Sequence, residues 1–433
     1  MVTKEVIVVG GSITGIQTAI DLGNRGYKVY LVEASPSIGG RMAQLDKTFP
    51  TNDCSICILA PKMIEAYQHP NVVPMTYSEV AGISGTVGNF KVKVRRKTRY
   101  VDMEKCTGCG ECIEKCPTKV KNEFDMDMGM RKAIYVPFPQ AVPRKVTIDP
   151  VNCKMISKGK CGVCKKVCQR GAIDYDLRDE IVELDIGAFV VCTGFDFYDM
   201  AKMPEYGYGR IKNVVTAMEF ERLLNASGPT MGHLVRASDH KEPKKIAFIH
   251  CAGSRDQHHI KYCTSVCCMH SVKEAILAHE HDAEVETFLF YIDLRTAGRN
   301  FYEYLQRANK DYGVNYIRSK VGKIKEDPNG NPVVVYEDLK AGGLKEMTVD
   351  MVVLAQALTV SKGSQEVGKT LGLEFDSDGF IKIPEILSRP MDTSIEGILA
   401  CGFCQGPMDI PQSVAQASGA AARVMELFET KKA

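Results

Sequence analysis

The stretch Val6-Ile7-Val8-Val9-Gly10-Gly11-Ser12-Ile13-Thr14-Gly15 decides the fold class of this 433-residue chain. Four apolar residues run directly into a glycine-rich turn, and a helix-like segment over 13–23 and a second apolar run over 28–32 follow. This order of strand, turn, helix and strand is typical of the βαβ unit that binds a dinucleotide. The pyrophosphate would lie at the amino end of the 13–23 helix, and Glu33, which ends the second strand, would accept a hydrogen bond from the ribose.

The match to the G-x-G-x-x-G fingerprint is incomplete. Gly10 and Gly15 match, but Ser12 stands in place of the middle glycine. That glycine lets the backbone approach the pyrophosphate, and serine is small enough to weaken the match without abolishing it. A glycine turn of an unrelated α/β fold remains the alternative.

Three further stretches favour FAD over NAD. Gly39-Gly40-Arg41 follows the acid as in two-dinucleotide-binding flavoproteins, and residues 190–194 and 393–402 resemble two later flavin-binding segments of those proteins. The last segment normally continues with an Asp that binds the ribityl chain, whereas here Phe403 follows and Asp409 is the candidate replacement. The predicted FAD contacts are Gly10, Gly11, Ser12, Gly15, Glu33, Gly40, Arg41, Thr193, Gly194, Gly402 and Asp409.

Two groups of cysteines have the spacing of iron–sulfur ligands. They are Cys106, Cys109, Cys112 and Cys116, followed by Pro117, and then Cys153, Cys161, Cys164 and Cys168. In two-cluster ferredoxins the cysteine that precedes the proline ligates the other cluster. We therefore expect two [4Fe–4S] clusters with crossed ligands, one held by Cys106, Cys109, Cys112 and Cys168 and the other by Cys161, Cys164, Cys116 and Cys153. Zinc is the alternative, but zinc sites rarely use this run.

The remaining cysteines are less specific. Cys251, Cys263, Cys267 and Cys268 fit no short motif, and their spacing alone leaves buried core cysteines as an equal alternative. Cys54 and Cys57, with Lys62 nearby, lie where flavin disulfide reductases carry a redox dithiol and a lysine, so all three are candidate catalytic residues. Together with Cys401 and Cys404, the pair leaves open a dithiol, a fourth cluster or small apolar side chains, and Cys192 is predicted to be a core residue.

Composition restricts the function classes. The net charge of +2 indicates neither a nucleic-acid binder nor a membrane-surface binder, and no apolar run approaches the roughly 18–20 residues of a membrane helix. The chain has seventeen cysteines, several of them in Cx2C pairs, and is long enough for a sizeable core. These features indicate metal ligation in a reducing cytoplasm rather than disulfides. Cys251 also occupies the place of a second glycine-rich turn after the strand over 246–249, so direct NAD(P)H binding is not expected.

We expect the domains in the following order. Residues 1–100 begin an FAD-binding domain, 101–180 form an inserted ferredoxin-like module, and 181–240 continue the FAD domain into a polar linker. Residues 241–350 form a second α/β domain of degenerate NAD(P)H-binding type, and 351–433 return to the FAD domain.

Several segments together resemble the A subunit of heterodisulfide reductase. They are residues 131–143, Cys251-Ala252-Gly253-Ser254-Arg255, the run from Tyr262 to Met269, and residues 405–411. The resemblance covers nearly the whole chain. It implies a thioredoxin-reductase-like α/β flavoprotein with two dinucleotide-binding domains and an inserted ferredoxin-like α+β module. It also implies that Cys251, Cys263, Cys267 and Cys268 ligate a third [4Fe–4S] cluster.

The same resemblance implies an oxidoreductase function. In that family FAD distributes electrons, and electron bifurcation is thought to occur within a multi-subunit complex that includes iron–sulfur carriers and hydrogenase or formate dehydrogenase modules. The chain resembles a short form without an additional carboxy-terminal ferredoxin module. Assembly into a homodimer is a further possibility. The alternatives are a self-sufficient flavin disulfide reductase that uses Cys54 and Cys57, and a non-enzymatic redox sensor or cluster scaffold.

Overall fold

A computed structural model describes residues 3–430, and the chain divides into two compact units. Of the described residues, the first unit comprises 3–43, 56–195 and 360–430, and the second comprises 44–55 and 196–359. Each unit is built on its own five-stranded parallel sheet. Among the described residues, none of the helices combines the length and apolar character that crossing a bilayer requires.

The sheet of the first unit has the strand order β24-β13-β1-β2-β5. Alternate residues of β1 belong to two different apolar clusters, Val6 and Val8 to one and Ile7 and Val9 to the other. Because the strand is buried on both faces, its sequence is continuously apolar rather than alternating. The strands are β1 (Glu5–Val9), β2 (Lys28–Glu33), β5 (Val72–Thr76), β13 (Ala188–Val191) and β24 (Ile398–Ala400).

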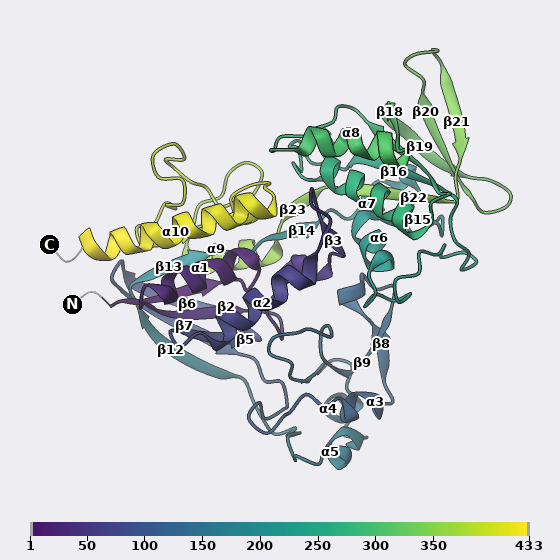
Figure 1. Ribbon diagram of the computed structural model, residues 1–433. Coiled ribbons are helices and arrows are strands. Elements are labelled where there is room, and N and C mark those ends of the chain that lie inside the picture. Colours follow the sequence, from purple (N-terminus) through teal and green to yellow (C-terminus); the bar gives the residue numbers. More distant parts are fainter. Residues whose placement is uncertain (1–2, 431–433) are drawn as a thin grey trace. The chain divides into compact units, whose positions relative to one another are not determined.

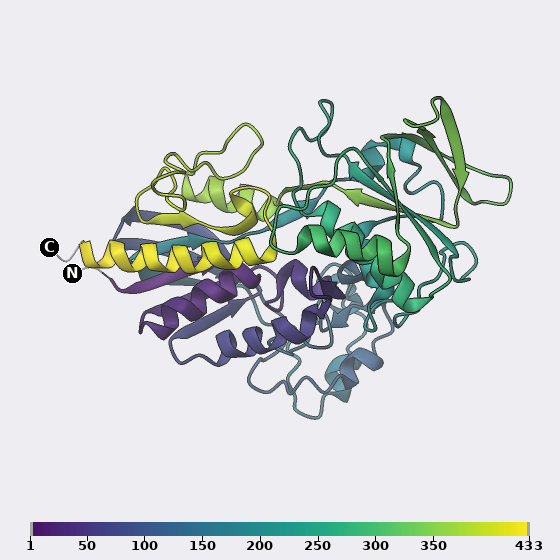
Figure 2. The ribbon, with the colours of Figure 1, turned by 45° about the horizontal axis from the view of Figure 1, so that its top comes forward.

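Helices pack on one side of this sheet. α1 (Ile13–Asn24) and α10 (Ile410–Thr430) lie side by side, purple and yellow in Figures 1 and 2, and their apolar side chains join the cluster of Val6 and Val8. Val9 and Ile7 pack instead with the antiparallel sheet β12-β7-β6. The further elements of this unit include α2 (Ser55–Gln68), β6 (Ser78–Thr86), β7 (Asn89–Arg96), β12 (Glu180–Ile186) and α9 (Lys362–Leu371).

The cysteine-rich segment is inserted between β7 and β12. These strands pair antiparallel, so they bring the two ends of the insertion together. The buried part of its small apolar cluster consists of ten residues, four of which are cysteines, while Phe138 and Ala141 of the insertion pack in the cluster of Val6 and Val8. Its elements are α3 (Glu111–Glu114), β8 (Lys119–Lys121), β9 (Met130–Lys132), β10 (Ile134–Tyr135), β11 (Thr147–Ile148), α4 (Lys154–Lys158) and α5 (Val163–Val167).

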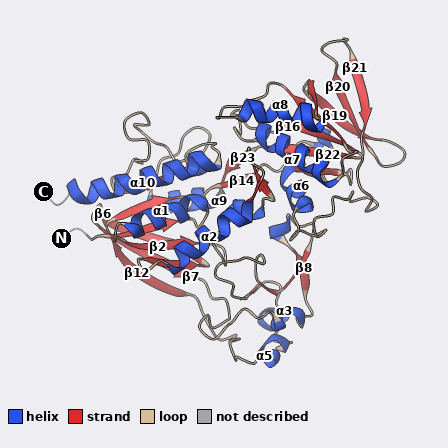
Figure 3. Ribbon diagram, viewed as in Figure 1, coloured by secondary structure: helices blue, strands red, loops and turns tan. Residues whose placement is uncertain are grey.

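The second unit has the parallel strand order β15-β22-β16-β17-β18, beside an antiparallel sheet β19-β20-β21 (Figure 3). Its strands are β15 (Val214–Thr216), β16 (Lys245–Ala252), β17 (Glu286–Tyr291), β18 (Asn315–Arg318), β19 (Val321–Glu326), β20 (Pro332–Glu337), β21 (Leu344–Thr348) and β22 (Met351–Gln356). Its helices are α6 (Ala217–Leu224), α7 (Cys267–His281) and α8 (Phe301–Tyr312). The short strands β3 (Lys47–Thr48) and β4 (Asp53–Cys54) pair, as do β14 (Phe195–Phe197) and β23 (Leu358–Val360).

The expected domain boundaries near residues 240 and 350 are corrected by these pairings. β15 pairs with β22, and β22 pairs with β16, so residues 196–240 and 351–359 lie in the second unit rather than in the FAD domain. The apolar run over 351–355 predicts a buried strand but does not indicate which of two parallel sheets it joins. The hydrophobic pattern alone therefore could not predict this domain boundary.

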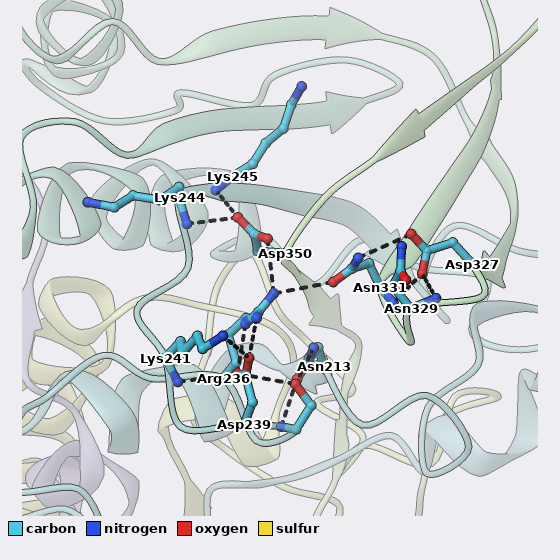
Figure 4. A network of polar contacts seen from close by, with 11 residues as sticks. Asn213, Arg236, Asp239, Lys241, Lys244, Lys245, Asp327, Asn329, Asn331 and Asp350 are labelled. Atoms are coloured by element: carbon cyan, nitrogen blue, oxygen red, sulfur yellow. Dashed lines mark hydrogen bonds and ion pairs between the residues drawn. The ribbon is translucent and has the colours of Figure 1, made fainter.

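The polar linker before β16 is held by one arginine (Figure 4). The Arg236 guanidinium donates to Asn331 Oδ1 at 3.2 Å and to Asp350 Oδ1 at 3.1 Å. The other oxygen of Asp350 accepts from the backbone N–H groups of Lys244 and Lys245, at 2.8 and 2.9 Å. One carboxylate thus fixes the linker and the start of β16 together.

A buried lysine–carboxylate pair lies inside the second unit. Lys273 on α7 donates to Glu221 on α6, and both side chains are fully buried. The second oxygen of Glu221 accepts from the Asp46 N–H at 2.8 Å, and Lys273 Nζ lies 3.3 Å from the Lys47 carbonyl oxygen. The pair therefore binds residues 44–55 to a unit that is distant in sequence. Burial lowers the pKa of Lys273 to about 8.

Replacing Lys273 with methionine should destabilise the second unit. The Lys273→Met variant leaves Glu221 buried without its cation, and we expect a loss of about 3–5 kcal/mol in the free energy of unfolding, measured with urea. The double variant Lys273→Met/Glu221→Gln should recover most of that loss. Lys62→Met, which removes the exposed Lys62–Glu65 pair, is the control and should change little. A double variant no more stable than the single one would show that the uncompensated charge is not the cause.

Candidate cofactor sites

Three segments meet at the glycine turn of the first unit. Gly10 has a φ of +109°, and a Cβ added there would lie 2.3 Å from the carbonyl oxygen of Cys192. A Cβ on Gly15 would lie 1.8 Å from the Gly10 oxygen. Both positions therefore exclude any side chain. This close approach places the start of α1 against the ends of β1 and β13.

The amino end of α1 has the properties of an anion site. Its N-cap residue, Ser12, makes no capping hydrogen bond, and no acidic residue stands in the first turn. The Ser12 hydroxyl lies 3.5 Å from the Cys192 carbonyl oxygen instead. A helix terminus without a side-chain cap favours a bound phosphate, so the turn fits the pyrophosphate of a dinucleotide.

Glu33 is oriented toward the same turn. Its carboxylate accepts hydrogen bonds from the N–H groups of Gly11 at 2.6 Å and Ser35 at 2.7 Å. An ionised carboxylate has about four acceptor positions, so two such bonds leave capacity for ribose hydroxyls. The remaining acceptor positions of Glu33 therefore fit the ribose contact predicted for it.

Other predicted FAD residues surround the turn. A Cβ on Gly40 would lie 2.8 Å from Ser12 Cβ, and one on Gly402 would lie 2.8 Å from Thr14 Oγ1. The Thr193 N lies 3.2 Å from the Cβ position of Gly10. Gly194 follows Thr193 with a φ of +66°, and Arg41 lies on the short 3₁₀ helix Gly40–Gln44. The structure thus brings these sequence-distant residues to one place.

Asp409 has a structural role of its own. One carboxylate oxygen accepts from the N–H of Gln412 at 2.8 Å, and the Asp409 carbonyl accepts from Ser413 at 3.0 Å. Asp409 therefore caps the amino end of α10. Its predicted ribityl contact stays a prediction and would have to use the other carboxylate oxygen.

The inserted module brings cysteines of its two groups together. Burial and the neighbouring sulfurs of Cys106, Cys164, Cys109 and Cys168 raise the pKa of Cys112 to about 12. The pKa of Cys164 is also raised, first by burial and then by Cys153 and Cys116. Cys168 thus lies near Cys112, and Cys116 lies near Cys164, although each belongs to the other sequence group. This arrangement fits the crossed ligand sets that the spacing predicts.

Tyr175 and two lysines beside these cysteines were missed by the sequence analysis. The Tyr175 hydroxyl lies 3.0 Å from Cys164 Sγ, Lys132 Nζ donates to the Cys116 carbonyl at 2.6 Å, and Lys145 donates to the Cys106 carbonyl. All three contacts depend on tertiary folding. No local pattern marks them.

Three cysteines of the third group meet in the second unit. Cys267 hydrogen-bonds both Cys251 and Cys268, which lowers the pKa of those two thiols and raises that of Cys267. The Cys251 backbone has a φ of +57° where the chain leaves β16, and Cys267 and Cys268 begin α7. Cys263 is half-buried, and its sulfur accepts from the Ser265 N–H at 3.3 Å. Neighbouring cysteine sulfurs, once deprotonated, are the ligands that an iron–sulfur cluster requires.

The remaining cysteines separate into two kinds. Cys54 and Cys57 are the disulfide-bonded cysteines of the described residues. Cys401 and Cys404 are fully buried thiols, and Cys401 Sγ lies 3.4 Å from Cys192 Sγ. The structure therefore favours a dithiol for the first pair and core side chains for the second. Lys62, the third catalytic candidate, is exposed and paired with Glu65 at 3.0 Å, so its role stays a prediction.

Comparisons with known proteins agree with this geometry. Residues 8–68 match the NAD(P)-binding Rossmann-like domain, and residues 99–121 match the 4Fe-4S binding domain. The thioredoxin reductase of Lactococcus lactis has a similar fold, with a TM-score of 0.54 and 15% identity over 98% of both chains. That of T. acidophilum has a TM-score of 0.52 and 13% identity, covering 99% of this chain and 100% of that one. The thioredoxin-reductase-like α/β fold is confirmed.

Curated relatives are much closer in sequence. The A subunit of the H(2):CoB-CoM heterodisulfide,ferredoxin reductase of Methanothermobacter thermautotrophicus is 47% identical over 423 residues, which cover 98% of this chain and 63% of that one. The second iron–sulfur A subunit of the CoB–CoM heterodisulfide reductase of Methanopyrus kandleri is 50% identical, covering 98% and 64%. The chain thus spans slightly less than two thirds of these relatives.

A third relative is matched over more of its length. This protein of Archaeoglobus profundus is named as similar to the A subunit of heterodisulfide reductase. It is 43% identical over an alignment 471 residues long, which covers 100% of this chain and 67% of the relative. The predicted resemblance is confirmed: the chain belongs to the family of heterodisulfide reductase A subunits.

Proposed function

We propose that this chain is an FAD- and [4Fe–4S]-containing electron-transfer subunit of a heterodisulfide-reductase-like oxidoreductase complex. The observation that supports the proposal is that cysteines of both sequence groups lie near one another in a module inserted into a thioredoxin-reductase-like fold. A dithiol reductase of that fold needs no such module. A chain that holds iron–sulfur clusters beside a flavin domain is suited to moving single electrons.

The flavin would exchange electrons in pairs on one side and singly on the other. The residues of the chain position and tune the groups. The turn at Gly10 and Gly15 and the end of α1 bind the pyrophosphate, and Glu33 orients the ribose. The twelve cysteines in the three groups hold three clusters, and neighbouring charge and burial adjust the potentials.

The names of the relatives support a role within a complex. They are named as A subunits, and one from Methanococcus maripaludis belongs to an H(2)/formate:CoB-CoM heterodisulfide,ferredoxin reductase. We propose that this chain has comparable partners, namely iron–sulfur carriers and a hydrogenase or formate dehydrogenase module. Electron bifurcation between acceptors of high and low potential is part of this proposal.

A self-sufficient disulfide reductase is the second candidate, because Cys54 and Cys57 form a disulfide. Rapid mixing with NADPH under anaerobic conditions separates the two functions. Our proposal expects no fast bleaching of the flavin, since Cys251 occupies the place of the nicotinamide-binding glycine turn. Rapid bleaching would favour the disulfide reductase, whereas purification from the native host without partner subunits would favour a redox sensor.

The anaerobically purified chain should contain one FAD and about twelve irons. Iron analysis and flavin absorbance measure both. About sixteen irons would indicate that Cys54, Cys57, Cys401 and Cys404 hold a fourth cluster. Eight or fewer would contradict the third cluster.

Removing the Glu33 carboxylate should weaken FAD binding. In Glu33→Ala the ribose loses its acceptor, and we expect a loss of about 1–3 kcal/mol in binding free energy, measured by FAD titration of the apoprotein. Glu65→Ala, which removes an exposed carboxylate on α2, is the control. Unchanged affinity in Glu33→Ala would place the adenosine elsewhere.

Cys268→Ala should remove the third cluster or convert it to a three-iron species, while FAD and the clusters of the insertion remain. Cys192→Ala is the matched control, because that thiol is a buried core residue of the first unit. It should cost about 1–2 kcal/mol of stability and no iron. Iron content, EPR after dithionite and flavin absorbance compare the two. Full iron and a wild-type EPR spectrum in Cys268→Ala would refute the third cluster.

A further inference from the structure

A buried histidine without a partner stands beside the third cysteine group. His250 is 5% exposed, and neither of its ring nitrogens has a hydrogen-bond partner among residues 3–430. Burying a polar group in this way destabilises a protein, so buried polar groups are almost always paired. The ring is therefore expected to face a group that binds to the folded chain.

The backbone directs this ring toward the cysteines. His250 and Phe248 point to the same side of β16, because side chains alternate along a strand. Phe248 packs on Phe220 of α6, at 5.5 Å between ring centroids, which identifies this as the helix side of the sheet. Pairing between β16 and β22 shifts between Ile249 and Ala252, and such an irregularity re-aims the side chains at a strand end.

His250 lies on the sheet face where Cys267 and Cys268 pack. These two cysteines cluster with Ala355 of β22, and Ala355 shares its face with Val353, which pairs with Phe248. After the hydrogen bond from Cys267, the nearby His250 ring further lowers the pKa of Cys268, and it also contributes to the lowered pKa of Cys251. Arg255, which also lies near Cys251, is already paired with Asp293. His250 thus lies beside these sulfurs, and neither of its ring nitrogens is in hydrogen-bonding geometry with an atom of residues 3–430.

We propose that His250 donates a hydrogen bond to the Cys268 sulfur of the third cluster and raises the reduction potential of that cluster without being a ligand. This inference rests on the proposed third cluster. A reduced cluster carries one more negative charge, so a donor to its sulfur stabilises the reduced form more than the oxidised form. The role requires only one N–H, which a neutral imidazole possesses.

The test is an EPR-monitored redox titration of the anaerobically purified chain. The signal that disappears in Cys268→Ala identifies the third cluster. In His250→Leu, we expect full iron content and a lower reduction potential of the third cluster. At a fixed applied potential, the ratio of reduced to oxidised cluster should fall about tenfold, which corresponds to a shift of about 59 mV for one electron. An unchanged potential, or the loss of about four irons because His250 is itself a ligand, would overturn the proposal.

Two amide variants make the test independent of the leucine variant. The side-chain NH₂ of His250→Asn approximates the position of Nδ1, and that of His250→Gln approximates Nε2. One variant should keep the wild-type potential and the other should show the lowered one, because only one ring nitrogen faces Cys268. Equal potentials in both would overturn the proposal even if His250→Leu does not fold.

The control is His279→Leu, the same change in the last turn of α7, where His279 Nε2 lies 3.2 Å from Thr287 Oγ1. It lies about 18 Å along the helix from Cys267 and should leave the potential unchanged. A shift as large as that of His250→Leu would overturn the direct contact. A wild-type chain with about eight irons and no third signal would refute the cluster itself, which distinguishes failure of the proposed function from failure of the role of His250.

Discussion

The close contact between the backbones of Gly10, Gly15 and Cys192 is the constraint on which the first unit depends. A single Cβ at either glycine would overlap a carbonyl oxygen. Only without side chains can α1 begin at the carboxyl ends of β1 and β13. That placement gives the end of α1, Glu33 and the loop after β13 a common position, which is where a dinucleotide binds in such sheets. The later segments around Gly40 and Gly402 pack against the same turn, with no room for larger residues.

The inserted module follows a different physical rule. Its own apolar cluster is small and partly made of cysteines. Sulfurs from both sequence groups lie near one another, and ligands shared between the groups would join the two halves of the module as well as hold iron. In our proposal, the same residues therefore supply stability and electron transfer.

The second unit contains two kinds of buried polar group, one paired and one without a hydrogen-bond partner among residues 3–430. Lys273 and Glu221 are fully buried and hold residues 44–55, at a desolvation cost that an apolar pair would avoid. His250 is buried, and neither of its ring nitrogens has a hydrogen-bond partner among residues 3–430. Where a nicotinamide-binding domain would have a glycine turn, Cys251 adopts a positive φ. The unit thus has a parallel sheet, and the end of β16 carries the Cys251 sulfur.

Local patterns were sufficient for the elements, and they also predict the crossed cluster ligands. The run from Val6 to Gly15 predicted β1 and the start of α1, and the position of Cys116 before proline predicted its partners in the other group. A strand, a helix start and a ligand motif each depend on residues that are close in the sequence, so the amino-acid sequence alone can indicate them. Tertiary structure alone decided that β15 and β22 join the second sheet, that residues 44–55 belong to it, and that Cys401 contacts Cys192. It also brought Glu221 to Lys273. Each of these contacts joins residues that are far apart in the chain. They form through strand pairing and burial, which a local sequence pattern does not indicate.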